Sequence, residues 1–323
     1  MTSPRQPSDE EIGHAAELIR AGKLVAFPTE TVYGLGANAL DAGAVARIFE
    51  AKGRPASSPI IVHVADIGMA RTVVAEWPAS AQVLVEKFWP GPLTLVLKKQ
   101  PVVPNLVTAG LATVGVRMPA NRIALALIEA ALVPIAAPSA NRFMQLSPTR
   151  AEHVRQSLGR GVDYVLDGGA CTVGIESTVL SLADDVPVLL RPGGVSRESI
   201  ESVIGPISQR TEATGEAHLS PGMHPRHYSP QTPLVLVHDG QVPSSGNGAY
   251  LQLQQAPLRA VKRLIVMPAS AVEYAFRLYS TLHELDAERL DWIAAEMPDD
   301  TSEWQAVRDR LRRAAGNALD VTR

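Results

Sequence analysis

The chain has 323 residues, of which 46% are hydrophobic and 20% charged, and this globular mix excludes a mainly disordered protein. It has no run of about 18 apolar residues and its first residues are polar and acidic, so we expect a cytoplasmic protein without a membrane span or secretion signal. The net charge is −3, with 18 Lys and Arg against 19 Asp and Glu up to Gly205, so direct binding to nucleic acid should be weak or absent.

The first 205 residues alternate predicted helices with predicted strands. Asp9 is expected to cap a first helix that ends at Gly22 and is followed by a buried strand over 23–27. Apolar runs predict further strands at 60–64, 93–97, 114–118, 135–137, 164–166, 178–182 and 186–190. Helical patterns fall between several of these, at 42–51, 79–88, 122–131 and 150–158. Because some neighbouring strands are joined by links too short for a crossover helix, we expect an α/β domain with a mixed sheet.

A change of composition divides the chain. From Gly205 to about residue 232 it is rich in Pro, Ser, Gly, His and Thr, which is typical of a linker with several turns. Beyond the linker, a small α/β module is predicted from strands at 234–237, 263–266 and 290–294 and helices at 269–285 and 302–315. We therefore expect a first domain over 1–205, a linker over 206–232 and a second domain over 233–323.

Three motifs in the first half of the chain carry polar or charged side chains. Segment 27–36 (FPTETVYGLG) ends a strand with two hydroxyls, a carboxylate and a phenol, although by itself it is more simply a strand-to-helix turn with permissive glycines. Lys52 and Arg54 flank Gly53 after a predicted helix, where they could neutralise phosphate or carboxylate oxygens or be solvated cations. His63 lies in an apolar run and is by default a core or edge histidine.

The rest of the first domain adds an arginine within a strand and polar groups at strand ends. Arg117 lies in an apolar strand pattern, so a neighbouring side chain or a ligand must supply a carboxylate. Short polar side chains occur at 138–141 and 147–149, and hydroxyls and an arginine stand beside glycines at 174–179 and 191–194. Open α/β sheets tend to bind ligands at such strand ends. With a single cysteine and no nucleophile elbow, the sequence favours neither a His/Cys metal cluster nor serine nucleophile chemistry.

Eight motifs in the same order resemble the YrdC-like domain of threonylcarbamoyl-AMP synthases. They are PTETVYGLGANAL (28–40), KGRP (52–55), PIIVHV (59–64), WPGPL (89–93), TVGVRMP (113–119), PSAN (138–141), ESTV (176–179) and RPG (191–193). Segment 220–230 and the module after it resemble the longer, two-domain branch of this family. The resemblance implies a YrdC-like domain with a twisted mixed sheet, plus a small C-terminal α/β module of Rossmann-like type.

The resemblance also implies which residues form the site. The L-threonine pocket would consist of Thr31, His63, Arg117, Ala137 and Ser177. Among them, Arg117 is the natural partner of the substrate carboxylate. The ATP contacts would be Lys52, Arg54, Ser58, Thr113, Ser139, Ser147, Arg191 and Tyr228. Lys52 and Arg54 would also be catalytic. Two positions depart from the family pattern, since Ser58 stands where asparagine is usual and His224-Pro225 where a basic-aromatic pair is usual.

The implied activity is synthesis of threonylcarbamoyl-AMP and pyrophosphate from L-threonine, bicarbonate and ATP. This is the first step of threonylcarbamoyladenosine modification of tRNA next to the anticodon. Mg²⁺ would accompany ATP without protein side chains as assigned ligands, and the product would pass to a tRNA threonylcarbamoyl-transferase complex. The linker would fold over the site as a lid, the simpler interpretation being an exposed tether. Two alternative functions stay open: a carbamoyltransferase with another acceptor, and a non-enzymatic RNA-binding protein.

Overall fold

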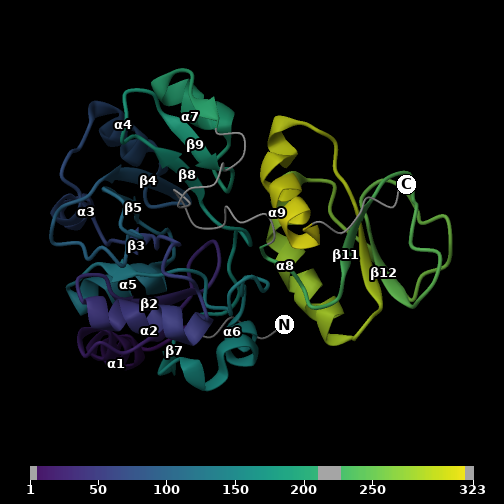
Figure 1. Cartoon of the computed structure of the whole chain (residues 1–323), viewed down its shortest axis with the longest axis horizontal. Coiled ribbons are helices and arrows are strands. Elements are labelled where there is room, and N and C mark those ends of the chain that lie inside the picture. Colours follow the sequence, from purple (N-terminus) through teal and green to yellow (C-terminus); the bar gives the residue numbers. More distant parts are fainter. Residues whose placement is uncertain (1–5, 210–226, 317–323) are drawn as a thin grey trace. The chain divides into compact units, whose positions relative to one another are not determined.

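The computed structural model describes residues 6–209 and 227–316 (Figure 1). The chain divides into two compact units. The first comprises the described residues of Met1–Phe143 and Pro148–Met223, and the second those of Met144–Ser147 and His224–Arg323. Most of the predicted linker, including His224-Pro225, lies outside the described residues. The predicted boundaries at 205 and 232 therefore stay predictions.

The first unit is built on a ten-stranded sheet in the order β10-β9-β8-β4-β5-β3-β6-β2-β1-β7. Its strands are β1 Val25–Phe27, β2 Gly34–Asn38, β3 Val62–His63, β4 Leu93–Lys98, β5 Thr113–Arg117, β6 Ile135–Ala136, β7 Tyr164–Val165, β8 Thr178–Ser181, β9 Val188–Arg191 and β10 Ser208–Gln209. The sheet contains parallel pairs such as β3 with β5 and antiparallel pairs such as β4 with β5, so the prediction of a mixed sheet is confirmed.

Helices pack against this sheet. They are α1 Asp9–Arg20, α2 Ala42–Lys52, α3 Ile67–Val73, α4 Ala79–Phe88, α5 Arg122–Ala131, α6 Ala151–Leu158 with a 3₁₀ turn at Gly159–Gly161, and α7 Arg197–Ile204. The predicted cap of α1 was wrong by one residue. Ser8 is the N-cap, and it forms a capping box in which its hydroxyl accepts from the Glu11 amide while the Glu11 carboxylate accepts from the Ser8 amide.

Strand alternation separates the core from the candidate site. In β4 and β5 the side chains at alternate positions, such as Leu95 and Val116, lie in the main hydrophobic core with the buried faces of α2 and α4. The intervening positions, Thr94, Gly115 and Arg117, therefore lie on the opposite face of the sheet. A second core cluster joins α1 and α5 to β1. This arrangement leaves polar side chains of neighbouring strands on one shared face.

The structure corrects the interpretation of segment 27–36. It is not a strand-to-helix turn, because β1 and β2 form an antiparallel pair across it, with Phe27 opposite Gly34. A Cβ atom added at Gly36 would come within 2.7 Å of the Phe27 ring and 2.9 Å of the Ile135 side chain. The glycine is thus required for close packing and not for a turn. The strand predicted over 60–64 is also shorter than expected, because only Val62–His63 (β3) forms a strand.

The second unit contains a four-stranded parallel sheet in the order β11-β14-β12-β13. Its elements are β11 Leu234–Val237, β12 Gly248–Gln252, β13 Arg263–Val266, α8 Ala271–Ala287, β14 Trp292–Glu296, a 3₁₀ turn at Ser302–Trp304 and α9 Gln305–Ala315. The prediction of a small α/β module is confirmed. The sequence analysis predicted no strand where β12 lies. A Cβ atom added at Gly248, the first residue of β12, would overlap the Trp292 ring. Within the described parts of the chain, none of the helices is both long and apolar enough to cross a bilayer.

Candidate functional site

Arg117 is the centre of a buried polar cluster in the first unit. Its Nη2 lies 2.6 Å from Oε1 of Glu30, and both side chains are almost completely buried. Its Nη1 donates to the Thr31 hydroxyl at 3.0 Å and its Nε to the Gly91 carbonyl at 3.2 Å. The Thr31 hydroxyl lies 2.8 Å from that of Thr29. The carboxylate that the sequence required beside Arg117 is therefore supplied by Glu30, which the sequence had not singled out.

His63 is the strand neighbour of Arg117. The two residues are paired in register between β3 and β5, and the His63 ring packs edge-on against Phe27 with 6.1 Å between ring centroids. Burial, with a smaller effect of the Arg117 charge, lowers the pKa of His63 to about 3. His63 is therefore neutral at physiological pH and adds no positive charge to the site.

A second cluster joins β4, β8 and β9. The Ser177 hydroxyl lies 2.8 Å from that of Thr94 and accepts a hydrogen bond from Nη2 of Arg191 at 3.2 Å. Arg191 also donates from Nε and Nη2 to the Ser177 carbonyl, at 3.1 and 3.0 Å. Thr94 directly precedes Leu95, the β4 partner of Val116, and Arg117 directly follows Val116. The two clusters are therefore neighbours on the same face of the sheet.

Lys52 and Arg54 lie at and just beyond the end of α2. Nζ of Lys52 donates to the carbonyl oxygens of Ser139 and Asn141, at 2.5 Å each, and Nη2 of Arg54 donates to the Pro59 carbonyl at 2.9 Å. Burial, followed by the nearby Arg54 charge, holds the pKa of Lys52 well below its usual range. A bound anion would offset both effects. The pair is buried, so the alternative of two solvated cations at a helix end is wrong.

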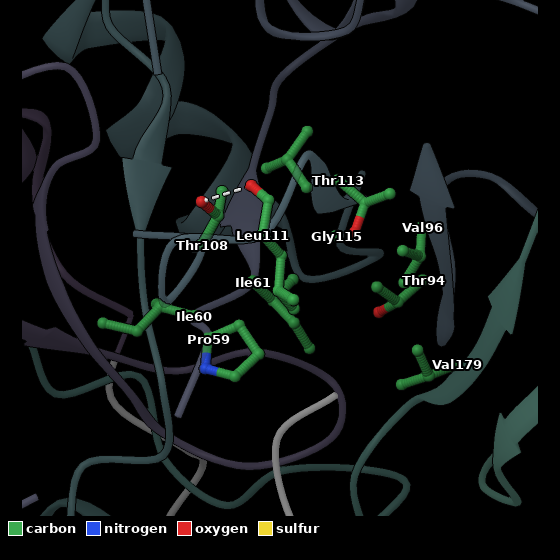
Figure 2. A pocket seen from close by; sticks show the side chains of 11 residues that line it. Pro59, Ile60, Ile61, Thr94, Val96, Thr108, Leu111, Thr113, Gly115 and Val179 are labelled. Atoms are coloured by element: carbon green, nitrogen blue, oxygen red, sulfur yellow. Dashed lines mark hydrogen bonds between the residues drawn. The ribbon is translucent and has the colours of Figure 1, made fainter. Parts of the chain in front are cut away.

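Figure 2 shows a pocket on the face of the sheet that carries Thr94 and Gly115. Thr94 from β4, Thr113 and Gly115 from β5 and Val179 from β8 line one side, and Pro59 belongs to the segment that leads into β3. The Thr108 hydroxyl donates to the Leu111 carbonyl at 2.9 Å and closes a turn at the rim. The pocket lining combines apolar side chains with the hydroxyl groups of Thr94, Thr108 and Thr113.

The predicted residues divide between the two units. The first unit holds Thr31, Lys52, Arg54, Ser58, His63, Thr113, Arg117, Ala137, Ser139, Ser177 and Arg191. Nearly all of these are buried, and Ser139 reaches Lys52 through its carbonyl rather than its hydroxyl. Ser147 and Tyr228 belong to the second unit, where both are buried. Thr29, Glu30 and Thr94 were missed as contributors, although the first two lie inside a motif that was recognised.

Charged side chains are buried in the interior of the first unit. Apart from histidines, the buried charged side chains among its described residues are the cations Lys52, Arg54, Arg117 and Arg191 and the carboxylates Glu30 and Glu176. Arginine and lysine side chains are well suited to bind the oxygens of an anionic ligand. In the described residues, no three His, Cys, Asp or Glu side chains gather as they would around a protein-held metal ion.

Comparison with known proteins agrees with this chemistry. A family model described as "Telomere recombination" matches residues 17–193, and one described as "Threonylcarbamoyl-AMP synthase, C-terminal domain" matches residues 195–316. The chain is 43% identical to the threonylcarbamoyl-AMP synthase of Bacillus subtilis, over 99% of this chain and 97% of that one. It is 44% identical to that of Pyrococcus abyssi, over 94% and 93%.

Solved structures give the same relationship. The structure of P. abyssi Sua5 complexed with L-threonine matches with a TM-score of 0.90 at 41% identity, over 98% of this chain and 97% of that one. E. coli YciO matches with a TM-score of 0.54 at 28% identity, over 61% of this chain and 96% of its own. The match to E. coli YciO therefore covers about as large a share of this chain as the first unit does.

Proposed function

The chain belongs to the threonylcarbamoyl-AMP synthase family, and we propose on that basis that it makes threonylcarbamoyl-AMP and pyrophosphate from L-threonine, bicarbonate and ATP. The observation that carries the proposal is the set of buried cations Lys52, Arg54, Arg117 and Arg191 among the described residues of the first unit. A triphosphate and an amino-acid carboxylate are anions of the kind that such cations can bind. This synthesis would be the first step of threonylcarbamoyladenosine modification of tRNA.

L-threonine is proposed to bind at the Arg117 cluster. Arg117 has five N–H donors, and its partners Glu30, Thr31 and Gly91 leave donor capacity for a substrate carboxylate. Ser177, His63 and Ala137 would complete a small pocket around the threonine side chain. A solved structure of the relative from P. abyssi contains L-threonine, which supports threonine as the substrate but names no binding residues.

ATP is proposed to bind through Lys52, Arg54 and Arg191, with Ser58, Thr113 and Ser139 orienting it. Phosphate oxygens would supply the negative charge that the buried Lys52 lacks, and so raise its lowered pKa towards the ordinary value. Ser147 and Tyr228 belong to the second unit, and their contacts with ATP stay a prediction of the resemblance. Lys52 and Arg54, buried beside each other, would stabilise the charge that develops on the leaving phosphates.

The proposed chemistry needs no protein nucleophile. Threonine nitrogen bonds to the carbon of bicarbonate with loss of water, giving a carbamate. A carbamate oxygen then attacks the α-phosphorus of ATP, and the bond from that phosphorus to the bridging oxygen breaks, releasing pyrophosphate. The protein would act by alignment of the reactants, which can contribute about 7–11 kcal/mol, and by the fixed cations.

Mg²⁺ is proposed to arrive with ATP. The buried carboxylates Glu30 and Glu176 are few, and Glu30 is paired with Arg117, so phosphate oxygens and water would be the main ligands, as Mg²⁺ commonly prefers. When bound, the ion would neutralise phosphate charge. We further propose that the protein works in the cytoplasm and that a tRNA threonylcarbamoyl-transferase complex uses the product.

The test is pyrophosphate release from ATP by the full chain. We expect release to depend on both L-threonine and bicarbonate, and ¹³C-bicarbonate to place the label in a product whose mass equals that of threonylcarbamoyl-AMP. Release that proceeds without threonine, or a product without the label, would contradict the proposal. Arg160→Ala, a change in the 3₁₀ turn after α6 at an exposed position, serves as the matched control and should leave release unchanged.

A further inference from the structure

The hydroxyl groups of Thr29 and Thr31 form a hydrogen-bonded chain whose direction follows from the atoms that it joins. The Thr29 hydroxyl oxygen lies 2.6 Å from the Val32 carbonyl oxygen and 2.8 Å from the Thr31 hydroxyl oxygen, and both threonines are buried. A carbonyl oxygen can only accept, so the contact with Val32 takes the single hydrogen of the Thr29 hydroxyl. The contact between the two hydroxyls must then use the hydrogen of Thr31, which donates to Thr29.

This direction makes the Thr31 hydroxyl an acceptor towards any ligand. Its oxygen has two lone pairs, and Nη1 of Arg117 donates to one of them at 3.0 Å. Within the described parts of the chain, no other donor contacts this oxygen. The Thr31 hydroxyl therefore offers one lone pair and no hydrogen. A guanidinium has only donors, so the Arg117 cluster presents a donor and an acceptor side by side.

The backbone around Thr29 holds this chain in place without a substrate. The amides of Thr31 and Val32 both donate to the Thr29 hydroxyl oxygen, at 3.2 Å each, so this side chain closes the turn in which it lies. The Thr31 carbonyl accepts from the Gly174 amide at 3.2 Å, which fixes the segment from its other side. All of these contacts lie within the first unit. The direction of the Thr31 hydroxyl is therefore set by the folded chain itself.

We propose that Thr29 is a positioning residue for L-threonine, because it commits the Thr31 hydroxyl to accept a hydrogen bond from an N–H or O–H group of the substrate. This rests on the proposed function, in which the substrate carboxylate binds Arg117. An amino acid bound in that way carries its N–H donors on the carbon next to the carboxylate, and L-threonine carries an O–H donor one carbon further. A ligand that offered only acceptors at this place would form no bond with Thr31.

The experiment compares Thr29→Val with Thr29→Ser in the full chain. Valine keeps the branched shape but releases the Thr31 hydrogen, which can then turn towards the substrate and oppose its donor. We expect Kd and KM for L-threonine to rise roughly 3- to 10-fold, with KM for ATP unchanged. Thr29→Ser keeps the hydroxyl and should stay close to the wild type. Calorimetric titration measures Kd, and pyrophosphate release measures both KM values.

The matched control is Thr72→Val. Thr72 is exposed in α3, and its hydroxyl also donates to a backbone carbonyl, that of Met69, at 2.7 Å. The same atoms are therefore exchanged away from the candidate site, and this variant should match the wild type in all three constants.

A second titration distinguishes the two possible donors. L-2-aminobutyrate differs from L-threonine only by the missing side-chain hydroxyl. If the amino group donates to Thr31, Thr29→Val should weaken the binding of both ligands by the same factor. If the side-chain hydroxyl donates, Thr29→Val should weaken the binding of L-threonine alone.

Three results would overturn the role of Thr29. One is an unchanged Kd for L-threonine in Thr29→Val. Another is an equal loss in Thr29→Ser, because shape rather than the hydroxyl would then matter. The third is a further loss when Thr29→Val is added to Thr31→Val, since a residue that acts through Thr31 has nothing left to act on.

Circular dichroism shows whether each variant folds. If Thr29→Val does not fold, Thr31→Val removes the acceptor itself, and an unchanged Kd for L-threonine in that variant would overturn the inference. A wild type that binds L-threonine but releases no pyrophosphate would contradict the proposed function, while the titrations would still decide the role of Thr29.

Discussion

Arg117 and Glu30 show how single side chains prepare the candidate site for an anion. Both side chains are nearly completely buried, and their 2.6 Å ion pair uses only some of the five N–H donors of the guanidinium. Removing one partner of such a pair leaves an uncompensated buried charge, which commonly costs about 3–5 kcal/mol. The pair therefore holds the Arg117 guanidinium in one orientation before any substrate arrives.

A first prediction separates the roles of the arginines. Arg117→Ala should raise KM for L-threonine roughly 10- to 100-fold, the loss of a charge-assisted hydrogen bond of about 1.5–3 kcal/mol, with a smaller effect on KM for ATP. Arg191→Ala should do the reverse. Steady-state pyrophosphate release with each substrate varied in turn measures both. Equal effects of the two changes on both constants would mean that the roles are not separate.

A second prediction concerns His63 and acid. Its pKa is about 3 in the folded chain and about 6.5 in the unfolded chain. Between these values the unfolded chain binds a proton that the folded chain does not. The free energy of unfolding is therefore highest above pH 6.5 and decreases as the pH falls towards 3. In urea unfolding between about pH 6 and pH 4, His63→Gln should show a dependence on pH weaker by about 1.4 kcal/mol per pH unit. His14→Gln, at an exposed position of α1, should behave as the wild type. A slope unchanged in His63→Gln would contradict this assignment.

The parts of the site that depend on neighbouring residues could be predicted from the sequence, and the parts that depend on contacts between distant residues could not. The alternation in β4 and β5 predicts strands from local pattern alone, and Arg117 among apolar residues predicts a missing carboxylate. Which carboxylate it is could not be predicted, because Glu30 comes from a loop whose distance from β5 is set by the order of strands in the sheet. Thr94 was missed for the same reason, since only the pairing of β4 with β8 brings it to Ser177.

At the scale of elements, the loop after β9 packs its backbone closely against residues 176–178, and this packing fixes the position of Arg191 at the end of β9. A Cβ atom added at Gly193 would come within 2.4 Å of the Glu176 carbonyl oxygen and of backbone atoms of Ser177 and Thr178. The loop after β9 therefore touches the ESTV segment directly. Short β2 has the same requirement at Gly36. Both positions look like turn signals in sequence, which is why the structural role of the glycines could not be predicted.

A third prediction follows from this contact. Gly193→Ala should force the loop away from residues 176–178, cost about 1–3 kcal/mol of folding stability and lower kcat, because Arg191 and Ser177 move apart. The control is Gly13→Ala in α1, where the added methyl has no neighbour within 4 Å; it should gain about 0.5–1 kcal/mol and keep full activity. Thermal unfolding and pyrophosphate release measure the two effects. Full activity in Gly193→Ala would show that the close approach does not position Arg191.

At the scale of the whole molecule, the sequence could predict two domains but not how the chain distributes between them. The shift to Pro, Gly and Ser near residue 205 indicates a boundary from composition alone. That Met144–Ser147 belongs to the second unit could not be predicted, because its contacts come from Ser229 and α8, far along the chain. The second unit thus takes a segment from within the sequence of the first.

The last prediction uses this distribution. A fragment of residues 1–209 contains the three hydrophobic clusters found among the described residues of the first unit and every predicted threonine contact, so it should fold and bind L-threonine within about 3-fold of the full chain. Circular dichroism and calorimetric titration with L-threonine make the measurement, with the full chain as the reference. If the folded fragment does not bind L-threonine, the threonine pocket is not confined to the first unit.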